Sequence, residues 1–280
     1  MSESEYISLV NGVHTATVDA GNRGLHYGDG LFETIAVRNG QPLHWDLHLR
    51  RLQRGCERLG IPAPAADVLA GEAQQVSDGH DRAVVKLILT RGGTRRGYRA
   101  EESVAANCIW RAHPWPDYPS RHGLDGVAVR LCRTPLARQP RLAGLKHLNR
   151  LEQVLARAEW RQEYEEGLML DTDGNVIEGV SSNLFMVQQG VLVTPLLDQC
   201  GVEGVTRDRV MEAAHRLGWS VRSKPLRVDE LLTSDEIFLT NTLIGIWPVK
   251  RIDAEAPHRS THAFTIGTCT RRLQEQINHD

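Results

Sequence analysis

The chain has 280 residues, which is long enough for one large domain or two smaller ones, each with a hydrophobic core. Its 33 basic and 35 acidic residues give a formal net charge of -2, which argues against a protein that binds nucleic acid or anionic membranes by general electrostatics. The five cysteines form no C-x-x-C pair, so they favour reduced thiols over a disulfide framework. No apolar run has the length of a membrane span and the start MSESEY has no secretion pattern, so we expect a cytoplasmic protein.

The first part of the chain alternates β-rich runs with helical patterns. YISLVNGV and LFETIAVRNGQPL each reach an Asn-Gly turn, which predicts β-hairpins. From residue 45 the period becomes helical and Gly60 ends the pattern. The apolar face of that helix is formed by Leu49, Leu52, Cys56 and Leu59. A second helix to about residue 77 and the strand AVVKLILTRG follow, so we predict an N-terminal α/β domain over residues 1–112.

Three prolines in HPWPDYPSRHG exclude helix, and we place a linker at residues 113–122 and a second α/β domain at 123–280. In that domain, GLMLDTDGNVIEGVSSNLFMVQQGVLVTP has two turn signals between β-rich runs and predicts consecutive antiparallel hairpins. EGVTRDRVMEAAHRLGW predicts a loop that leads into a helix, and EIFLTNTLIGIWPV predicts a strand that breaks and resumes. The predicted class is α+β, two mixed α/β domains with an antiparallel bias.

A lysine precedes a helical pattern in LAGLKHLNRLEQVLARAEW, residues 142–160. The apolar positions of that pattern are Leu148, Leu151, Leu155 and Ala158. This spacing predicts that Lys146 lies at a helix N-terminus, where unpaired N–H groups and the helix dipole disfavour an ammonium ion. Partial burial would lower the pKa of this amine further, and a neutral amine is a nucleophile. The alternative is a solvated surface lysine.

Four other residues suit a bound phosphate. Thr206 follows a glycine at the start of a predicted helix, Asn241 and Thr242 interrupt an apolar strand, and Arg51 lies beside the buried face of its helix. Each also has a structural interpretation, as a helix cap, a turn residue or a surface arginine. Together with Lys146 and with Glu178, which lies between Ile177 and Gly179, they suggest a phosphorylated aldehyde cofactor.

Several common catalytic and nucleotide-binding motifs are absent from the sequence. There is no G-x-S-x-G elbow, P-loop or dinucleotide fingerprint. His44 and His48 are four residues apart, but the glutamate of a zinc protease is missing between them, so we predict no metal site.

Six segments occur in the order found in fold type IV pyridoxal-phosphate enzymes. They are RGLHYGDGLFET, HLRRL, LKHLNRLEQVLAR, GNVIEGVSSNLF, GVTRDRV and LTNTLIGIWPV. The chain thus resembles, over nearly its whole length, a superfamily of branched-chain aminotransferases, D-amino acid aminotransferases and 4-amino-4-deoxychorismate lyases. The resemblance implies two domains joined by a short linker with the cofactor between them, and a homodimer whose sites borrow residues from the neighbouring subunit.

The resemblance also implies roles for single residues. The cofactor-binding set is Lys146, Glu178, Arg51, Thr206, Thr242 and Asn183. Lys146 resembles the Schiff-base lysine and is the expected catalytic residue, and Glu178 resembles the partner of the pyridine nitrogen. Arg51, in an H-x-x-R element, resembles a ligand of the cofactor phosphate, with Thr206 and Thr242 completing that pocket.

Two segments, KHLNRLEQVLAR and NTLIGIWPV, resemble the lyase branch most closely. Branched-chain aminotransferases carry Gly-Thr-Ala-Ala where this chain has Asn-Thr-Leu-Ile, and D-amino acid aminotransferases use Arg-x-His where it has Arg-Gly-Tyr. A dicarboxylic substrate would favour additional arginines, so we expect Arg96 and Arg150 to contact the substrate, together with Asn241. The alternative for both arginines is an ordinary solvated side chain.

The expected function is therefore a small-molecule lyase reaction, the conversion of 4-amino-4-deoxychorismate to 4-aminobenzoate and pyruvate on the way to folate. An aminotransferase of the same fold, acting on D-amino acids or branched-chain amino acids, would use the same lysine. A non-catalytic protein that has kept the fold would bind the cofactor without turnover.

Overall fold

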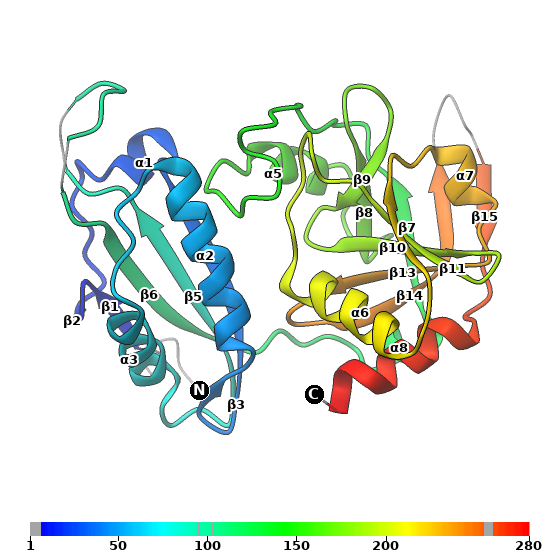
Figure 1. The fold of residues 1–280 in the computed structure, drawn as a ribbon, viewed down its shortest axis with the longest axis horizontal. Coiled ribbons are helices and arrows are strands. Elements are labelled where there is room, and N and C mark those ends of the chain that lie inside the picture. Colours follow the sequence, from blue (N-terminus) through cyan, green and yellow to red (C-terminus); the bar gives the residue numbers. More distant parts are fainter. Residues whose placement is uncertain (1–6, 94–95, 102–103, 255–259, 280) are drawn as a thin grey trace. The chain divides into compact units, whose positions relative to one another are not determined.

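The computed structural model describes residues 7–93, 96–101, 104–254 and 260–279 (Figure 1). The chain divides into an N-terminal unit, Met1–Asp117 with Leu145–Asn149, and a C-terminal unit, Tyr118–Gly144 with Arg150–Asp280. The chain first passes from one unit to the other between Asp117 and Tyr118, which lie inside the predicted linker. Leu145–Asn149 belongs to the N-terminal unit, which differs from the prediction that the whole of 123–280 forms the second domain.

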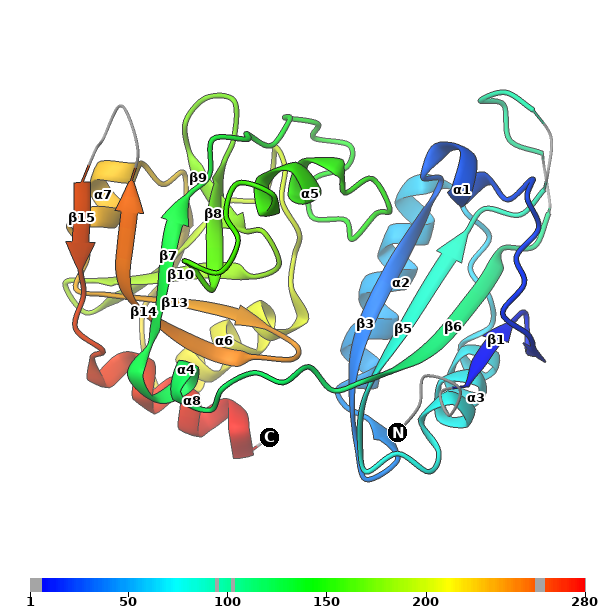
Figure 2. The ribbon, with the colours of Figure 1, turned by 180° about the vertical axis from the view of Figure 1, so that it is seen from behind.

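The N-terminal unit contains one six-stranded sheet in the order β2-β1-β6-β5-β3-β4, and all of its neighbouring strands are antiparallel. Its elements are β1 (Ser8–Val10), β2 (Val13–His14), α1 (Arg23–Tyr27), β3 (Gly30–Arg38), β4 (Gln41–Pro42), α2 (Trp45–Leu59), α3 (Ala66–Ser77), β5 (Arg82–Thr90) and β6 (Asn107–Pro114). Helices α2 and α3 cover the same face of this sheet, as the views from the front and from behind both show (Figures 1 and 2).

Local sequence signals account for most of this unit. Both Asn-Gly pairs have positive φ, Asn11 at 51° and Asn39 at 50°, which matches the twist of a tight hairpin and confirms the two predicted turns. Leu52 and Cys56 are buried on the predicted face of α2. The helix ends at Gly60, whose left-handed conformation (φ 62°) suits a glycine.

The C-terminal unit contains a nine-stranded sheet in which β12, β11, β10, β13, β14, β7, β8 and β9 follow one another and β15 pairs with β14. Its elements are α4 (Arg121–Asp125), β7 (Val127–Leu131), α5 (Leu151–Arg157), β8 (Glu166–Leu170), β9 (Val176–Gly179), β10 (Asn183–Gln188), β11 (Val191–Pro195), α6 (Val205–Arg216), β12 (Val221–Lys224), α7 (Val228–Leu232), β13 (Glu236–Asn241), β14 (Gly245–Ala254), β15 (Ser260–Ala263) and α8 (Thr268–His279). The antiparallel pairs β8–β9 and β10–β11 confirm the two predicted hairpins.

Strand β10 shows how the core of this unit is built. Leu184 and Met186 point into one apolar cluster, whereas Phe185 and Val187 point into another on the opposite face of the strand. Because both faces are covered, the strand is apolar from Leu184 to Val187 and does not alternate there. Phe185 stacks on Phe238 at 5.1 Å between ring centroids, beneath side chains of α6 and α8.

The predicted helix after Lys146 differs from the observed one. Helix α5 begins at Leu151, and its buried residues are Gln153 and Ala156. Leu151 and Leu155, predicted to face inward, are 77% and 60% exposed. The prediction of this apolar face is wrong because the residues before Leu151 are not helical, and Lys146 and Leu148 bond to β3 instead.

All five cysteines are free thiols, as their spacing predicted. Burial raises the pKa of Cys56 to about 11 and that of Cys132 to about 12, which disfavours the reactive thiolate. Over the described ranges, no helix has both the length and the apolar character needed to span a membrane. Within the same ranges, no group of three or more His, Cys, Asp or Glu side chains is placed to hold a metal ion.

Candidate active site

Leu145–Asn149, which we call the lysine strap, lies along β3. The N–H of Phe32 donates to the carbonyl of Lys146 at 2.9 Å, and the N–H of Leu148 donates to the carbonyl of Gly30 at 3.0 Å. The Lys146 ammonium nitrogen lies 4.3 Å from the centroid of the Phe32 ring. Lys146 is thus fixed by strand pairing, and the prediction that it lies at a helix N-terminus is wrong, since α5 begins five residues later.

Two glycines make room for the strap. Gly28 has φ +62°, and a Cβ there would lie 2.5 Å from the side-chain oxygen of Asn149. A Cβ on Gly30 would lie 2.3 Å from the carbonyl oxygen of Leu89 and 2.9 Å from the side chain of Leu148. The strap, at the start of LKHLNRLEQVLAR, therefore packs against RGLHYGDGLFET, although the two are far apart in the sequence.

A buried ion pair joins β3 to α2 beside the strap. Arg51 donates from Nε to Oε1 of Glu33 at 2.8 Å and from Nη2 to Oε2, and His48 Nδ1 lies 2.7 Å from the same Oε2. Burial by itself raises the pKa of Glu33. The charge of Arg51 and the hydrogen bonds from Arg51 and His48 outweigh that effect and lower the pKa to about 2. Glu33 is therefore an ionised carboxylate at neutral pH.

His48 is fully buried in this cluster. Burial lowers its pKa below the usual value, and the charges of Arg51 and Lys146 lower it further, although Glu33 acts in the opposite direction. A neutral His48 can satisfy Glu33 only by donating its Nδ1 proton, which leaves Nε2 as a lone-pair acceptor. Nε2 is buried and has no hydrogen-bond partner among the described residues.

In the C-terminal unit, Glu178 lies on β9 and is 4% exposed. Its Oε2 accepts a hydrogen bond from the N–H of Val202 at 2.8 Å. The carbonyl of Val202 in turn accepts from the side-chain amide of Asn183 at 2.7 Å. Glu178 and Asn183 therefore hold the loop 201–204 from two strands that follow each other in the sequence, β9 and β10.

The same loop leads into α6. Gly204 is the N-cap, and no side chain caps the helix. A Cβ on Gly204 would lie only 2.0 Å from the side-chain oxygen of Asn183, so any other residue here would displace that amide. Thr206, 3% exposed, lies in the first turn, which confirms the predicted helix start. Backbone N–H groups at such an uncapped N-terminus suit a phosphate.

Asn241 and Thr242 lie where β13 turns into β14, as predicted. The side-chain oxygen of Asn241 accepts hydrogen bonds from the N–H groups of Leu243 and Ile244 at 2.9 and 3.0 Å. Its amide nitrogen donates to the carbonyl of Ser181 at 3.0 Å. These bonds show that Asn241 builds the turn that presents Thr242.

The two predicted substrate arginines belong to different units and differ in exposure. Arg150 is the half-buried N-cap of α5, and Arg96 is an exposed residue between β5 and β6. The neighbouring Gly97 is anchored, since its carbonyl accepts from Arg23 at 2.9 Å and its N–H donates to the hydroxyl of Tyr27 at 3.0 Å.

The predicted residues thus form two groups, one in each unit. Lys146 and Arg51 lie near β3. Glu178 and Asn183 bond to the loop 201–204, and Thr206 follows that loop in the first turn of α6. Glu33 and His48 were missed at the level of sequence. The period-2 pattern of β3 places Glu33 on the same face as the buried Leu31, Ile35 and Val37. A charged residue among apolar residues on one strand face is the sequence signal that could have identified Glu33 as a candidate site residue.

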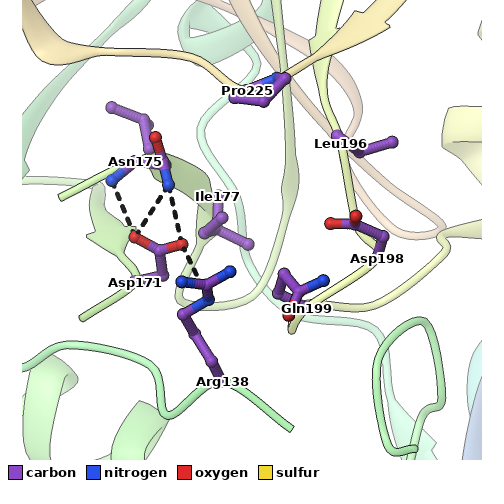
Figure 3. Close-up of a pocket in the computed structure, with 9 residues that line it drawn as sticks. Arg138, Asp171, Asn175, Ile177, Leu196, Asp198, Gln199 and Pro225 are labelled. Carbon is purple, nitrogen blue, oxygen red and sulfur yellow. Dashed lines mark hydrogen bonds and ion pairs between the residues drawn. The ribbon is translucent and has the colours of Figure 1, made fainter. Parts of the chain in front are cut away.

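A cavity of about 120 Å³ in the C-terminal unit lies apart from the predicted residues (Figure 3). Val176 and Ile177 of β9 line it, whereas the next residue of that strand, Glu178, does not. Asp171 and Asn175 in its wall bond to each other, at 3.0 Å between Oδ2 and Nδ2. None of the predicted site residues lines this cavity.

Comparisons with known proteins identify the family of the chain. Residues 30–252 match the family described as amino-transferase class IV. The chain is 36% identical to an aminodeoxychorismate lyase of Vibrio harveyi over 96% of this chain and 98% of that protein. It is 32% identical to a putative branched-chain-amino-acid aminotransferase of Methanocaldococcus jannaschii over 94% and 90% of the two chains. A crystal structure of 4-amino-4-deoxychorismate lyase from Pseudomonas aeruginosa has a TM-score of 0.92 and 46% identity, covering 98% of this chain and 99% of that chain.

The chain therefore belongs to the amino-transferase class IV family and has the fold type IV architecture of pyridoxal-phosphate enzymes. The residues fit that cofactor. The uncapped N-terminus of α6 suits its phosphate, Glu178 is a buried carboxylate suited to a protonated ring nitrogen, and Lys146 has a primary amine of the kind that its aldehyde takes up.

Proposed function

We propose that this protein is a pyridoxal-phosphate-dependent lyase that converts 4-amino-4-deoxychorismate to 4-aminobenzoate and pyruvate, a step toward folate. The observation that carries the proposal is the 46% identity to the Pseudomonas aeruginosa lyase, which extends over nearly the full length of both chains. The 36% identity to the Vibrio harveyi lyase, again over nearly full length, supports the same substrate.

We propose that residues of each group have a role in cofactor binding. Arg51 provides a guanidinium for the phosphate, and Thr206 provides its hydroxyl and the N–H groups of the first turn of α6. Thr242, presented by the turn that Asn241 holds, completes the phosphate ligands. Asn183 contributes by holding the loop 201–204 in place.

When bound, pyridoxal phosphate supplies an aldehyde that takes up an amine and a ring that withdraws electrons from the carbon bearing that amine. Lys146 Nζ holds the cofactor until the substrate arrives, and then removes the proton from the substrate carbon that bears the amine. The Glu178 carboxylate keeps a proton on the ring nitrogen, and the N–H of Val202 fixes the orientation of that carboxylate. The bond between the ring carbon and the enolpyruvyl oxygen breaks as the substrate ring becomes aromatic, and the departing enolpyruvate takes up a proton to become pyruvate.

The acid groups of the substrate require cations, and Arg96 and Arg150 are our candidates, with Asn241 as a further contact. Arg96 is presented by a loop whose backbone Arg23 and Tyr27 anchor. That anchoring reduces the entropy that the loop loses when it binds a carboxylate.

The test incubates the purified protein and pyridoxal phosphate with enzymatically generated 4-amino-4-deoxychorismate and follows both products. We expect 4-aminobenzoate and pyruvate in equal amounts, and no turnover by Lys146→Ala. If neither product forms while D-alanine or leucine is turned over with 2-oxoglutarate, the aminotransferase alternative is correct.

Lys86 provides a matched control, because its ammonium lies 5.3 Å from the same Phe32 ring that Lys146 contacts. Borohydride, which traps a lysine joined to an aldehyde, is expected to attach the cofactor to the wild type and to Lys86→Ala, but not to Lys146→Ala. Attachment to Lys146→Ala would contradict the role of Lys146.

Glu178→Ala separates binding from chemistry. We expect this variant to retain the cofactor, measured by absorbance after gel filtration, and to lose most of its turnover, because no carboxylate holds the ring nitrogen protonated. An unchanged rate would remove Glu178 from the mechanism.

A homodimer and a cytoplasmic location stay predictions. We propose the dimer because the family resemblance implies sites that borrow residues from the neighbouring subunit. Light scattering coupled to size-exclusion chromatography measures the mass directly, and a monomer of 31.3 kDa that is fully active would contradict it.

A further inference from the structure

The contacts between Glu33 and Arg51 define the orientation of the guanidinium. Glu33 accepts from Nε and Nη2 of Arg51, which form one edge of the planar group. Nη1 therefore points away from Glu33. Both side chains are buried, 2% exposed for Glu33 and 7% for Arg51, so the orientation is fixed within the packing between β3 and α2.

Stability alone does not explain this pair. Burying two charges carries a desolvation cost, and replacing a buried pair by apolar side chains of similar size is often neutral or stabilising. The neighbours of Glu33 on this face of β3, Leu31 and Ile35, are apolar and buried. An apolar side chain at position 33 would continue that face, which indicates that the carboxylate serves the site.

We propose that Glu33 is a positioning residue for cofactor binding: it holds the Arg51 guanidinium in the orientation that receives the cofactor phosphate, and His48 completes the carboxylate's contacts. This inference rests on the proposed function, in which Arg51 binds the phosphate. A guanidinium held at two N–H groups loses less conformational entropy when it binds an anion, so Glu33 raises phosphate affinity without touching the cofactor.

His48 supports this role from the same helix. It lies three residues before Arg51 on α2, so both side chains meet Glu33 from one helix face. With His48, the carboxylate receives three N–H contacts, one at Oε1 and two at Oε2. A carboxylate with this coordination is held rigidly and stays ionised.

The test measures phosphate preference, which we define as the dissociation constant of pyridoxal divided by that of pyridoxal phosphate for the apoprotein. Pyridoxal lacks only the phosphate, so the ratio isolates the phosphate contacts. We expect Glu33→Gln to lower the ratio about tenfold or more, in line with the loss of a charged hydrogen-bond partner, and to change pyridoxal binding less than about twofold.

Glu72→Gln is the matched control. Glu72 is in the same unit and accepts a hydrogen bond from the Trp110 indole at 2.7 Å, with no contact to Arg51. This variant should keep the wild-type phosphate preference. If Glu33→Gln does not fold, Glu33→Asp keeps the charge but shortens the side chain by one methylene, and a selective loss of phosphate preference is again expected.

Arg51→Met tests whether Arg51 binds the phosphate, separately from whether Glu33 positions it. If Glu33 acts only through Arg51, then Arg51→Met and Glu33→Gln/Arg51→Met should have the same low phosphate preference. If Arg51→Met keeps the wild-type preference, Arg51 does not bind the phosphate and that part of the proposed function fails. If Arg51→Met loses it while Glu33→Gln and Glu33→Asp keep it, only the positioning role is overturned.

Discussion

Glu33 of the N-terminal unit and Glu166 of the C-terminal unit are both buried, and they differ in what surrounds them. Glu33 is 2% exposed and pairs with Arg51 and His48, so its pKa is lowered. Glu166 is 6% exposed and accepts from the hydroxyls of Ser181 and Ser182 at 2.7 and 3.0 Å, and burial raises its pKa. Hydroxyl donors therefore do not offset desolvation as a guanidinium does.

The two glutamates also serve different purposes. Glu166 ties β8 to the turn that leads from Glu178 to Asn183, since it also accepts from the N–H of Ser181 at 3.1 Å. A Cβ on Gly179 would lie 2.1 Å from the Ser182 hydroxyl, so this turn is closely packed. Glu166 shapes a backbone, whereas Glu33 orients a cation.

The largest expected effect comes from removing that cation. Arg51→Met should lower the free energy of unfolding by about 3–5 kcal/mol, because Glu33 would stay buried without its counter-charge. Urea unfolding of the apoprotein measures this loss. Glu33→Leu/Arg51→Met should recover most of it, and an equal loss in the double variant would show that the cost lies in packing.

A smaller loss of stability is expected when the carboxylate of Glu33 or Glu166 is replaced by an amide, and the loss should differ between the two sites. Glu33→Gln should cost about 1–3 kcal/mol, since Arg51 loses a charged partner, whereas Glu166→Gln should cost under about 1 kcal/mol because the amide oxygen still accepts from the serines. Denaturation of both variants under one condition gives the comparison. Equal losses would mean that burial, rather than the partner, dominates both sites.

The smallest effect is a pair of opposite pH dependences. The folded-state pKa of Glu33, about 2, lies below its ordinary value of 4.5, so its contribution to stability is complete above pH 4.5 and is lost as the pH falls toward 2. The stability difference between wild type and Glu33→Gln should therefore shrink between pH 5 and pH 3, as estimated from the proton linkage.

Glu166 should show the reverse dependence. Its folded-state pKa is raised, so its contribution is present below the ordinary value and declines as the pH rises through the folded-state pKa. The difference between wild type and Glu166→Gln, measured by urea unfolding across the same series, should therefore shrink as the pH rises. Parallel curves for Glu33→Gln and Glu166→Gln would contradict the contrast between the two sites.

Features encoded by adjacent residues were predictable from the sequence. The turns at Asn11 and Asn39 follow from Asn-Gly pairs, and Gly60 ends α2 as its position predicted. The start of α6 near Thr206 was likewise visible as a glycine before a helical pattern. In each case the decisive interactions lie within a few residues.

Features that depend on distant partners were not predictable in this way. The apolar spacing after Lys146 favours a helix, but β3 supplies hydrogen bonds to the strap from more than a hundred residues away. The role of Glu33 was equally hidden, because its partners lie on another element. The propensity of a short segment is a weak preference that such tertiary contacts override.

The lysine strap has a consequence for how the protein folds while it is being synthesised on the ribosome. All strands of the N-terminal sheet have been synthesised once the chain reaches Pro114. The hydrogen bonds of Gly30 and Phe32 to Leu148 and Lys146 can form only after the later segment has also been synthesised. Because chains are synthesised from the N-terminus, this first unit stays unfinished until the beginning of the second has been made. The segment that carries the proposed catalytic amine is thus the piece that completes the earlier fold.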